Sequence, residues 1–293
     1  MKQAVILINA YSRLEHSLNQ SRRLKEEFEA RGVHTDILRN DGFFATIGDD
    51  GSICNRLRQY DFCVYLDKDK YVSQLLERSG MRLFNRHDAI VGCDDKMTTA
   101  ILLSARGIPV PKTLPGLLCY DAQEKVAERT LRTIESELGF PVIVKHSYGS
   151  LGNGVFKADD FEQLRAIAED VKCSPHLFQR FVRESAGRDM RVIVIGGKYA
   201  AAMERRSAGD FRSNLELGGT GRAIEPSADV VAMCERVAAL LQLDYCGIDV
   251  LFGKESFYVC EVNSNAFFGG MERATDKNIA ALYAEHMLGC IYG

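Results

Sequence analysis

Residues 247–263 read Gly-Ile-Asp-Val-Leu-Phe-Gly-Lys-Glu-Ser-Phe-Tyr-Val-Cys-Glu-Val-Asn, which predicts two strands joined by a short loop. The first strand carries Asp249, and the second carries Glu261 and Asn263. Because side chains two residues apart in a strand point to the same face, Glu261 and Asn263 project together. Oxygen ligands clustered on a rigid face suit a hard cation such as Mg²⁺. The hairpin therefore predicts a metal site formed by these three residues.

The length of the loop decides whether Asp249 joins that face. A three-residue loop, Lys254–Ser256, places Asp249 opposite Glu261, whereas a four-residue loop places it opposite Cys260 on the other face. The metal hypothesis therefore predicts an odd-numbered loop. It also predicts that Cys260 and its mostly apolar neighbours of the same parity pack against a core.

Composition bounds the class of protein. The 293 residues suffice for two or three domains, and a net charge of −3 gives no general attraction for nucleic acid or anionic lipid. No apolar run reaches the length of a secretory signal or a membrane span, so we expect a cytoplasmic protein without nucleic-acid or membrane partners. The nine cysteines include no Cys-x-x-Cys pair, which favours buried free thiols over a zinc site.

The first part of the chain alternates strands and helices. Ala4–Ile8, Val33–Leu38 and Phe62–Leu66 are predicted strands, and Leu14–Arg31 is a predicted helix. This alternation predicts a parallel α/β layer. Ligands gather at the carboxyl ends of such strands, which makes Asn9–Ser12 a candidate binding loop, with a plain connecting loop as the alternative.

The remainder reads as α+β, with hairpins in place of crossovers. Gly196-Gly197 predicts a hairpin turn. The expected elements are a helix over Asp94–Arg106, strands over Phe140–Lys145 and Val155–Ala158, a helix over Phe161–Val171, strands over Leu177–Val182, Met190–Ile195 and Lys198–Arg206, a polar loop over Ala208–Arg222, and helices over Ala228–Leu241 and Asn278–Leu288.

Two features favour anion binding. Lys145 ends a buried strand and precedes the glycine-bearing loop 146–154, whose backbone N–H groups can approach a phosphate while the lysine adds a charge. The loop is not a Walker A motif, and a hairpin turn is the alternative. Further along, Arg205, Arg206 and Arg212 suit a multiply charged anion or a transferring phosphoryl group, with an exposed charged hairpin as the alternative.

The order of these motifs resembles the ATP-grasp superfamily, and within it the RimK-type (alpha-L-glutamate ligase-like) amino-acid ligases, over essentially the whole chain. Glu204-Arg205-Arg206 and Gly209–Leu215 match the family pattern almost letter for letter. The resemblance implies an α/β N-terminal parallel-sheet (pre-ATP-grasp) domain followed by an α+β ATP-grasp fold of two subdomains. The corresponding ranges are 1–88, 89–178 with a glycine-rich lid, and 179–293 with the metal site.

The resemblance also implies roles for individual residues, with ATP lying between the two subdomains. The residues expected to hold the nucleotide are Lys96 and Lys145 at the phosphates, Ser147, Gly149, Gly152 and Gly154 in the lid, Gln179, Arg180, Phe181 and Val182 around the adenine, Asp189 near the ribose, and Arg191, Ser213 and Asn214. The residues expected to serve catalysis are Lys145, Arg205, Arg212 and Asn214. Asp249, Glu261 and Asn263 would bind two Mg²⁺ ions, with Mn²⁺ as an alternative.

The activity that the resemblance implies is an ATP- and Mg²⁺-dependent carboxylate–amine ligase. It would act through an acyl phosphate and add an amino acid such as glutamate to an amine or peptide acceptor. A glutathione-synthetase-like or natural-product peptide ligase, an ATP-grasp kinase and a non-catalytic nucleotide-binding regulator stay open. A homo-oligomer is compatible with the resemblance.

Two departures from the family bear on specificity. Asn265-Ala266-Phe267-Phe268 stands where the family commonly has a Pro-Gly turn beside the substrate, and Arg180 stands where an acidic residue is usual. We expect the two aromatic residues to change the acceptor side more than the nucleotide side.

Overall fold

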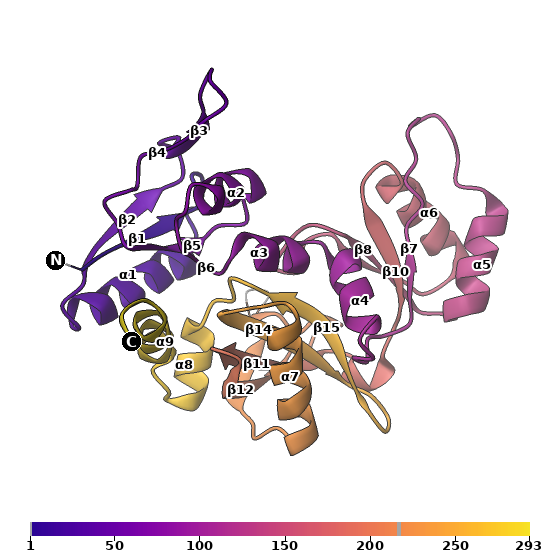
Figure 1. Ribbon diagram of the computed structural model, residues 1–293. Coiled ribbons are helices and arrows are strands. Elements are labelled where there is room, and N and C mark those ends of the chain that lie inside the picture. Colours follow the sequence, from indigo (N-terminus) through magenta and orange to yellow (C-terminus); the bar gives the residue numbers. More distant parts are fainter. Residues whose placement is uncertain (1, 216–217) are drawn as a thin grey trace.

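The computed structural model describes residues 2–215 and 218–293, and its N-terminal layer is a parallel sheet with helices packed on it (Figure 1). The strands run in the order β2-β1-β5-β6, all parallel, and β1 and β5 are buried because such a sheet is covered on both faces. This confirms the predicted α/β layer. The elements are β1 (Gln3–Ile8), α1 (Glu15–Glu29), β2 (His34–Arg39), the unpredicted hairpin β3 (Ala45–Ile47) and β4 (Ile53–Asn55), β5 (Phe62–Leu66), α2 (Lys70–Arg78) and β6 (Leu83–Phe84).

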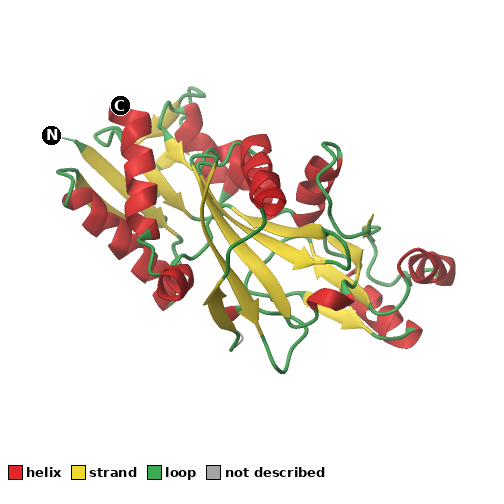
Figure 2. Cartoon of the chain, turned by 90° about the horizontal axis from the view of Figure 1, so that it is seen from below, coloured by secondary structure: helices red, strands yellow, loops and turns green. Residues whose placement is uncertain are grey.

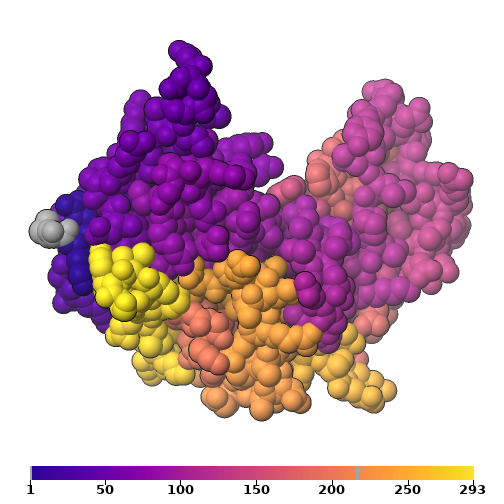
Figure 3. All heavy atoms as spheres, viewed as in Figure 1, coloured from indigo at the N-terminus to yellow at the C-terminus, as the bar shows by residue number. Residues whose placement is uncertain are grey.

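The central part is an antiparallel sheet in the order β7-β10-β8-β9, with α5 and α6 packed against it. The strand β9 and the helix α6 have the predicted limits. Figure 3 shows this part standing away from the N-terminal layer, with the surface hollowed between them. Its elements are β7 (Thr113–Pro115), α5 (Glu128–Leu138), β8 (Val142–His146), β9 (Val155–Ala158), α6 (Phe161–Val171) and β10 (His176–Arg180).

The third part is a five-stranded antiparallel sheet in the order β13-β12-β11-β14-β15. The predicted polar loop ends in the edge strand β13, and α8 was not predicted. The domain limits stay predictions, and the one between residues 178 and 179 falls inside β10. The elements are the 3-10 turn η1 (Arg183–Ser185), β11 (Arg188–Ile195), β12 (Lys198–Arg206), β13 (Thr220–Ala223), α7 (Ala228–Leu240), β14 (Tyr245–Phe252), β15 (Phe257–Asn263), α8 (Gly269–Thr275) and α9 (Ile279–Tyr292).

The predicted helix over Asp94–Arg106 is present as α4 (Lys96–Ser104), and an unpredicted helix, α3 (His87–Asp94), directly precedes it. Asp95 between them is extended, and its carboxylate accepts hydrogen bonds from the N–H groups of Met97 and Thr98. Asp95 is therefore the N-cap of a new helix, and Lys96 is its first residue.

The loop of the hairpin β14–β15 differs in length from the prediction, but Asp249 and Glu261 still lie opposite each other. Phe252 pairs with Phe257, so the loop has four residues, and the predicted odd-numbered loop is wrong. A register shift after Asp249 leaves Cys260 as an extra residue in β15, and Asp249 therefore still lies opposite Glu261. The same bulge overturns the prediction for Cys260, whose side chain points into a cleft rather than the core.

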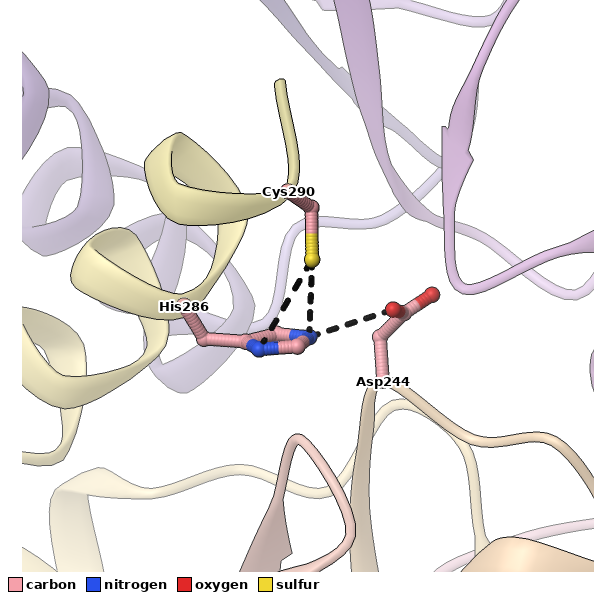
Figure 4. Close-up of side chains that lie close together, drawn as sticks. All are labelled: Asp244, His286 and Cys290. Carbon is pink, nitrogen blue, oxygen red and sulfur yellow. Dashed lines mark hydrogen bonds and ion pairs between the residues drawn. The ribbon is translucent and has the colours of Figure 1, made fainter. Parts of the chain in front are cut away.

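The C-terminal helix ties the third part to the first. Figures 1 and 2 show α9 running beside α1, and both helices contribute to one buried apolar cluster. Figure 4 shows a polar junction nearby, where His286 of α9 lies 3.1 Å from a carboxylate oxygen of Asp244. Arg82 donates to both oxygens of that carboxylate at 2.9 and 3.0 Å. None of the described helices is long and apolar enough to cross a membrane.

Cys290 completes the junction in Figure 4, and its arrangement does not favour metal binding. Its sulfur lies 3.9 and 3.7 Å from the two ring nitrogens of His286, so it is not on the lone-pair axis of either. The carboxylate of Asp244 is already neutralised by Arg82. The three side chains therefore serve as a structural link between the parts.

Candidate functional site

Most of the predicted site residues line one cleft between the central sheet and the C-terminal sheet. The cleft encloses about 820 Å³ of empty space, including the part open to solvent. The predicted residues that line it are Lys96, Lys145, Gly149, Gly152, Gln179, Arg180, Phe181, Val182, Asp189, Arg205, Arg212, Ser213, Asn214, Asp249 and Glu261. Ser147, Gly154, Arg191 and Asn263 are not part of its lining.

Lys145 lies at the floor of this cleft. It is buried, and its Nζ donates to Oε1 of Gln179 at 2.8 Å and lies 3.4 Å from Sγ of Cys260. Ile143 lines the same cleft because it lies two residues before Lys145 on β8 and therefore shares its face. The acceptors that Lys145 contacts are neutral, so its charge is available to an anion.

Lys96 connects the start of α4 to the glycine-rich loop. Its Nζ donates to the carbonyl of Gly149 at 2.8 Å, and its backbone N–H donates to the carbonyl of Ser147 at 2.9 Å. Burial lowers the pKa of Lys96, although Glu261, 3.7 Å away, opposes that effect. Ser147 is buried and does not line the cleft, and the backbone hydrogen bond from Lys96 holds the loop at this residue.

Arg212 contacts the same loop from the opposite side. Its Nη1 donates to the carbonyl of Gly152 at 2.8 Å, while its other nitrogens pair with Asp210 at 2.7–3.3 Å. Gly152 has a φ of 78°, which an L-amino acid with a side chain rarely adopts. Two cations from different elements thus hold the loop over the cleft by its backbone carbonyls.

A buried network of alternating charges forms the wall on the C-terminal sheet. Arg205 donates to both oxygens of Asp189 at 2.8 and 2.6 Å and lies 3.0 Å from Oδ2 of Asp249. Arg191 donates to both oxygens of Asp249 at 2.7 Å each. Burial opposes ionisation of Asp249, but the two guanidinium groups outweigh it and lower the pKa of that carboxyl.

The register of the strands creates this network. A bulge between Ile193 and Val194 shifts the pairing of β11 with β12, so that Asp189 lies opposite Arg205. Without that shift, a two-residue turn would place Asp189 opposite Glu204, and two like charges would share one face.

The predicted metal ligands have the donor set of a hard cation. Oδ1 of Asp249 accepts one hydrogen bond and Oδ2 accepts two, which leaves one lone-pair position of the carboxylate. Glu261 is half-buried and faces Lys96. The Nδ2 of Asn263 is buried and finds no hydrogen-bond partner among the described residues. An amide N–H group does not coordinate a cation, so the oxygens that suit Mg²⁺ on this face of the hairpin are the carboxylates of Asp249 and Glu261 and the Oδ1 of Asn263.

A second cleft adjoins the first and shares Arg205 with it. It encloses about 990 Å³, again including the part open to solvent. Its lining consists of Glu15, His16 and Asn19 of α1, Arg191 of β11, Met203 and Arg205 of β12, Leu215, Phe267, and Gly269, Gly270 and Arg273 of α8. The candidate loop Asn9–Ser12 lines neither cleft, and the N-terminal layer contributes the start of α1 instead.

The two aromatic residues that replace the family turn have different roles. Phe267 lines the second cleft, and its ring centroid lies 5.1 Å from that of His16. Phe268 is fully buried in the core, so the prediction that both aromatics alter the acceptor side is wrong for Phe268. The carbonyl of Ala266 accepts hydrogen bonds from Gln20 of α1 and from the hydroxyl of Tyr245. The segment is therefore held by the N-terminal layer.

Sequence reasoning missed several residues of the first cleft. Its apolar walls include Ile143, Leu251 and Phe211, and Cys260 lies beside Lys145. Ile143 and Leu251 could have been found, because each lies two residues from a predicted site residue on the same strand. Cys260 could not, since its direction depends on the bulge.

Comparison with known proteins gives matches at the levels of family, sequence and fold. The family model that describes the RimK-like ATP-grasp domain matches residues 93–287. The chain is 37% identical over 227 residues to beta-citrylglutamate synthase B of Homo sapiens. The alignment covers 76% of this chain and 57% of the synthase. The chain is also 32% identical over 285 residues to a probable alpha-L-glutamate ligase of Psychromonas ingrahamii. That alignment covers 92% of this chain and 91% of the ligase.

Among solved structures, the ATP-grasp ligase PsnB complexed with a phosphomimetic variant of its minimal precursor, Mg and ADP is similar with a TM-score of 0.69. The match covers 99% of this chain and 98% of that chain at 21% identity, which shows the predicted fold alone. The chain spans little more than half the length of the human synthase.

Proposed function

The chain belongs to the RimK-like ATP-grasp family, and we propose that it is an ATP- and Mg²⁺-dependent ligase that joins a carboxylate to an amine. The observation that carries the proposal is the pair of adjoining clefts that share Arg205. One cleft suits a nucleotide, the other suits a second substrate, and a buried guanidinium lies where they meet.

The first cleft supports nucleotide binding through charge and shape. Lys145 donates to the neutral amide oxygen of Gln179, and a phosphate oxygen is a stronger acceptor. Lys96 and Arg212 each face one carboxylate, and each also donates to a backbone carbonyl that a phosphate oxygen could replace. Apolar side chains, among them Ile143 and Phe181, line the same cleft beside the main chain of β10. An apolar slot with a few polar groups suits a purine ring.

Asp249, Glu261 and Asn263 would hold Mg²⁺ at the phosphate end of this cleft. The ion would neutralise charge on the phosphate oxygens when it is bound. Arg191 and Arg205 hold the Asp249 carboxylate in place, so the ligand is oriented before any ion arrives. The number of ions and the use of Mn²⁺ stay predictions.

The reaction we propose has two steps. A carboxylate oxygen of one substrate attacks the γ-phosphorus of ATP, the bond to the β-phosphate oxygen breaks, and ADP leaves. The nitrogen of the amine substrate then attacks the acyl carbon, loses a proton, and displaces inorganic phosphate. Arg205 and Arg212 would stabilise the charge that develops on the oxygens, and the loop held by Lys96 would exclude water.

The substrates follow from the relatives as a proposal. One relative is named a probable alpha-L-glutamate ligase and another a beta-citrylglutamate synthase, which supports an amino acid such as glutamate as one substrate. An amine or peptide acceptor of another kind, as in a glutathione-synthetase-like or natural-product peptide ligase, is the second candidate because Phe267 lines the second cleft.

The test is ADP release with ATP and Mg²⁺ against amino acids and small carboxylic acids, singly and in pairs, with mass spectrometry of the products. We expect one pair to give ADP, phosphate and a condensed product that is lighter than the two substrates by one water. ADP release that yields a phosphorylated hydroxyl compound would identify a kinase instead. The absence of ADP release with every pair would contradict the proposal.

A further inference from the structure

The floor of the second cleft keeps hydrogen-bond donors for an anion. Arg191 uses Nε and Nη2 on Asp249, and Arg205 uses Nε and Nη2 on Asp189 and Asp249. The Nη1 group of each arginine has no acceptor among residues 2–215 and 218–293. The two carboxylates balance the two guanidinium charges, so this floor orients an anion without a large net charge.

The rim of the cleft carries an additional positive charge. Arg273 of α8 lines the cleft and forms no ion pair or hydrogen bond with the described part of the chain. A Cβ atom on Gly269 would lie 3.6 Å from Nη1 of Arg273, and one on Gly270 would lie 3.9 Å from Nη2. The guanidinium group of Arg273 therefore lies over these two glycines. Glu15, the carboxylate of this lining, already pairs with Arg22. The described part of the rim is therefore cationic.

The remaining wall is apolar and is fixed from the N-terminal layer. The rings of Phe267 and His16 face each other at 5.1 Å, and Met203 and Leu215 line the same cleft. Gln20 donates to Oδ1 of Asn265 and to the carbonyl of Ala266, both at 3.3 Å, which anchors the segment that carries Phe267. The cleft thus offers donors at the floor, a cation at the rim and an apolar wall between them.

We propose that the second cleft takes a substrate with two carboxylates, and that Arg273 is the specificity-determining residue that recognises the carboxylate farther from the reaction. This rests on the proposed function for the location of the reacting group. The floor donors of Arg191 and Arg205 face the reacting end, and the chain between the carboxylates lies against Phe267. Acidic amino acids and small polycarboxylic acids both have this chemistry.

The test compares ligands that differ in a single charge. Calorimetric titration of the full chain with L-glutamate, L-glutamine and citrate, each with and without ATP and Mg²⁺, measures binding without requiring turnover. We expect L-glutamate or citrate to bind at least tenfold more tightly than L-glutamine. Arg273→Gln should weaken the binding of the acidic ligand about tenfold and leave that of L-glutamine unchanged, whereas Arg273→Lys should retain part of the preference.

A matched control separates recognition from loss of charge. Arg129 is an exposed arginine on α5 of the central part, so Arg129→Gln removes the same charge far from the cleft lining and should leave every affinity unchanged. In turnover, Arg273→Gln should raise the KM for the acidic substrate about tenfold while kcat and the KM for ATP stay constant, because Arg273 does not line the nucleotide cleft.

The outcomes distinguish this inference from the proposed function. Equal affinity of the wild-type chain for L-glutamate, citrate and L-glutamine, or an unchanged preference in Arg273→Gln, would overturn the inference even if ligase activity is found. Charge-selective binding that depends on Arg273, with no ADP release for any substrate pair, would support the inference and count against the proposed function. Selectivity for L-glutamate alone identifies an amino acid, and selectivity for citrate alone identifies a polycarboxylic acid.

Discussion

Replacing Asp249 by asparagine should destabilise the fold as well as remove a metal ligand. The Asp249 carboxylate is buried, and it is the carboxylate partner of Arg191 and a second partner of Arg205. Asp249→Asn keeps the shape of the side chain but leaves the charge of Arg191 without a counter-ion among the described residues. Breaking a buried pair from one side typically costs about 3–5 kcal/mol.

That free energy converts to a measurable shift in melting temperature. For a chain of this size, about 2–4 °C of melting temperature corresponds to 1 kcal/mol, so Asp249→Asn should melt about 6–20 °C below the wild-type chain. Thermal unfolding followed by circular dichroism without added Mg²⁺ measures this effect apart from metal binding.

Glu261→Gln supplies the matched control. Glu261 lies on the facing strand and is partly exposed, and Lys96 is 3.7 Å away. An ion pair of this kind contributes about 0–1 kcal/mol, so the control should melt within about 4 °C of the wild-type chain. Equal melting temperatures for Asp249→Asn and Glu261→Gln would refute the description of Asp249 as the centre of a buried charge network.

Four further outcomes are expected. Glu261→Ala should abolish ADP formation with the melting temperature unchanged within about 4 °C, and normal turnover would count against the metal assignment. Chelation by EDTA should stop ADP release, and excess Mg²⁺ should restore it. Arg212→Ala should lower kcat about a hundredfold because a donor to the transferring group and a contact with Gly152 are lost, and an unchanged kcat would disprove that role. The pKa of Glu27 is lowered, first by its hydrogen bond from Asn278. Its stabilising effect is present above pH 4.5 and lost as the pH falls through the lower folded-state pKa, so acid unfolding should be less steep in Glu27→Gln.

Local signals predicted the elements that depend on local properties. The strand β9 and the helix α6 have the expected limits because their periodicity is local and the capping residue Asp160 directly precedes α6. The helix α3 was missed, although the N-cap Asp95 marks the start of a separate helix directly after it.

The charged residues of the site were predicted, but the way they are paired was not. Two bulges, one after Asp249 and one between Ile193 and Val194, set which charges face each other. A bulge depends on contacts that are distant in sequence, such as the hydrogen bond from the N–H of Val259 to the carbonyl of Pro109. The direction of Cys260 and the Asp189–Arg205 pair could therefore not be read from strand parity.

The contribution of the N-terminal layer to the site also needed the tertiary structure. The expected loop at the end of β1 is held by Arg39, which donates to the carbonyl of Ser12 at 2.7 Å, and it lines neither cleft. His16 and Asn19 line the second cleft because α1 packs beside α8 and α9. A helix that contributes polar residues to another domain has no distinct pattern in sequence.

The central claim is that a carboxylate is activated as an acyl phosphate, and trapping by hydroxylamine tests it most directly. The chain is incubated with ATP, Mg²⁺, hydroxylamine and the carboxylic acid that supports ADP release, and the products are identified by mass spectrometry. We expect a hydroxamate of that acid in step with ADP, and none with Glu261→Ala. ADP formed in step with a phosphorylated hydroxyl compound, with no hydroxamate, would contradict the account.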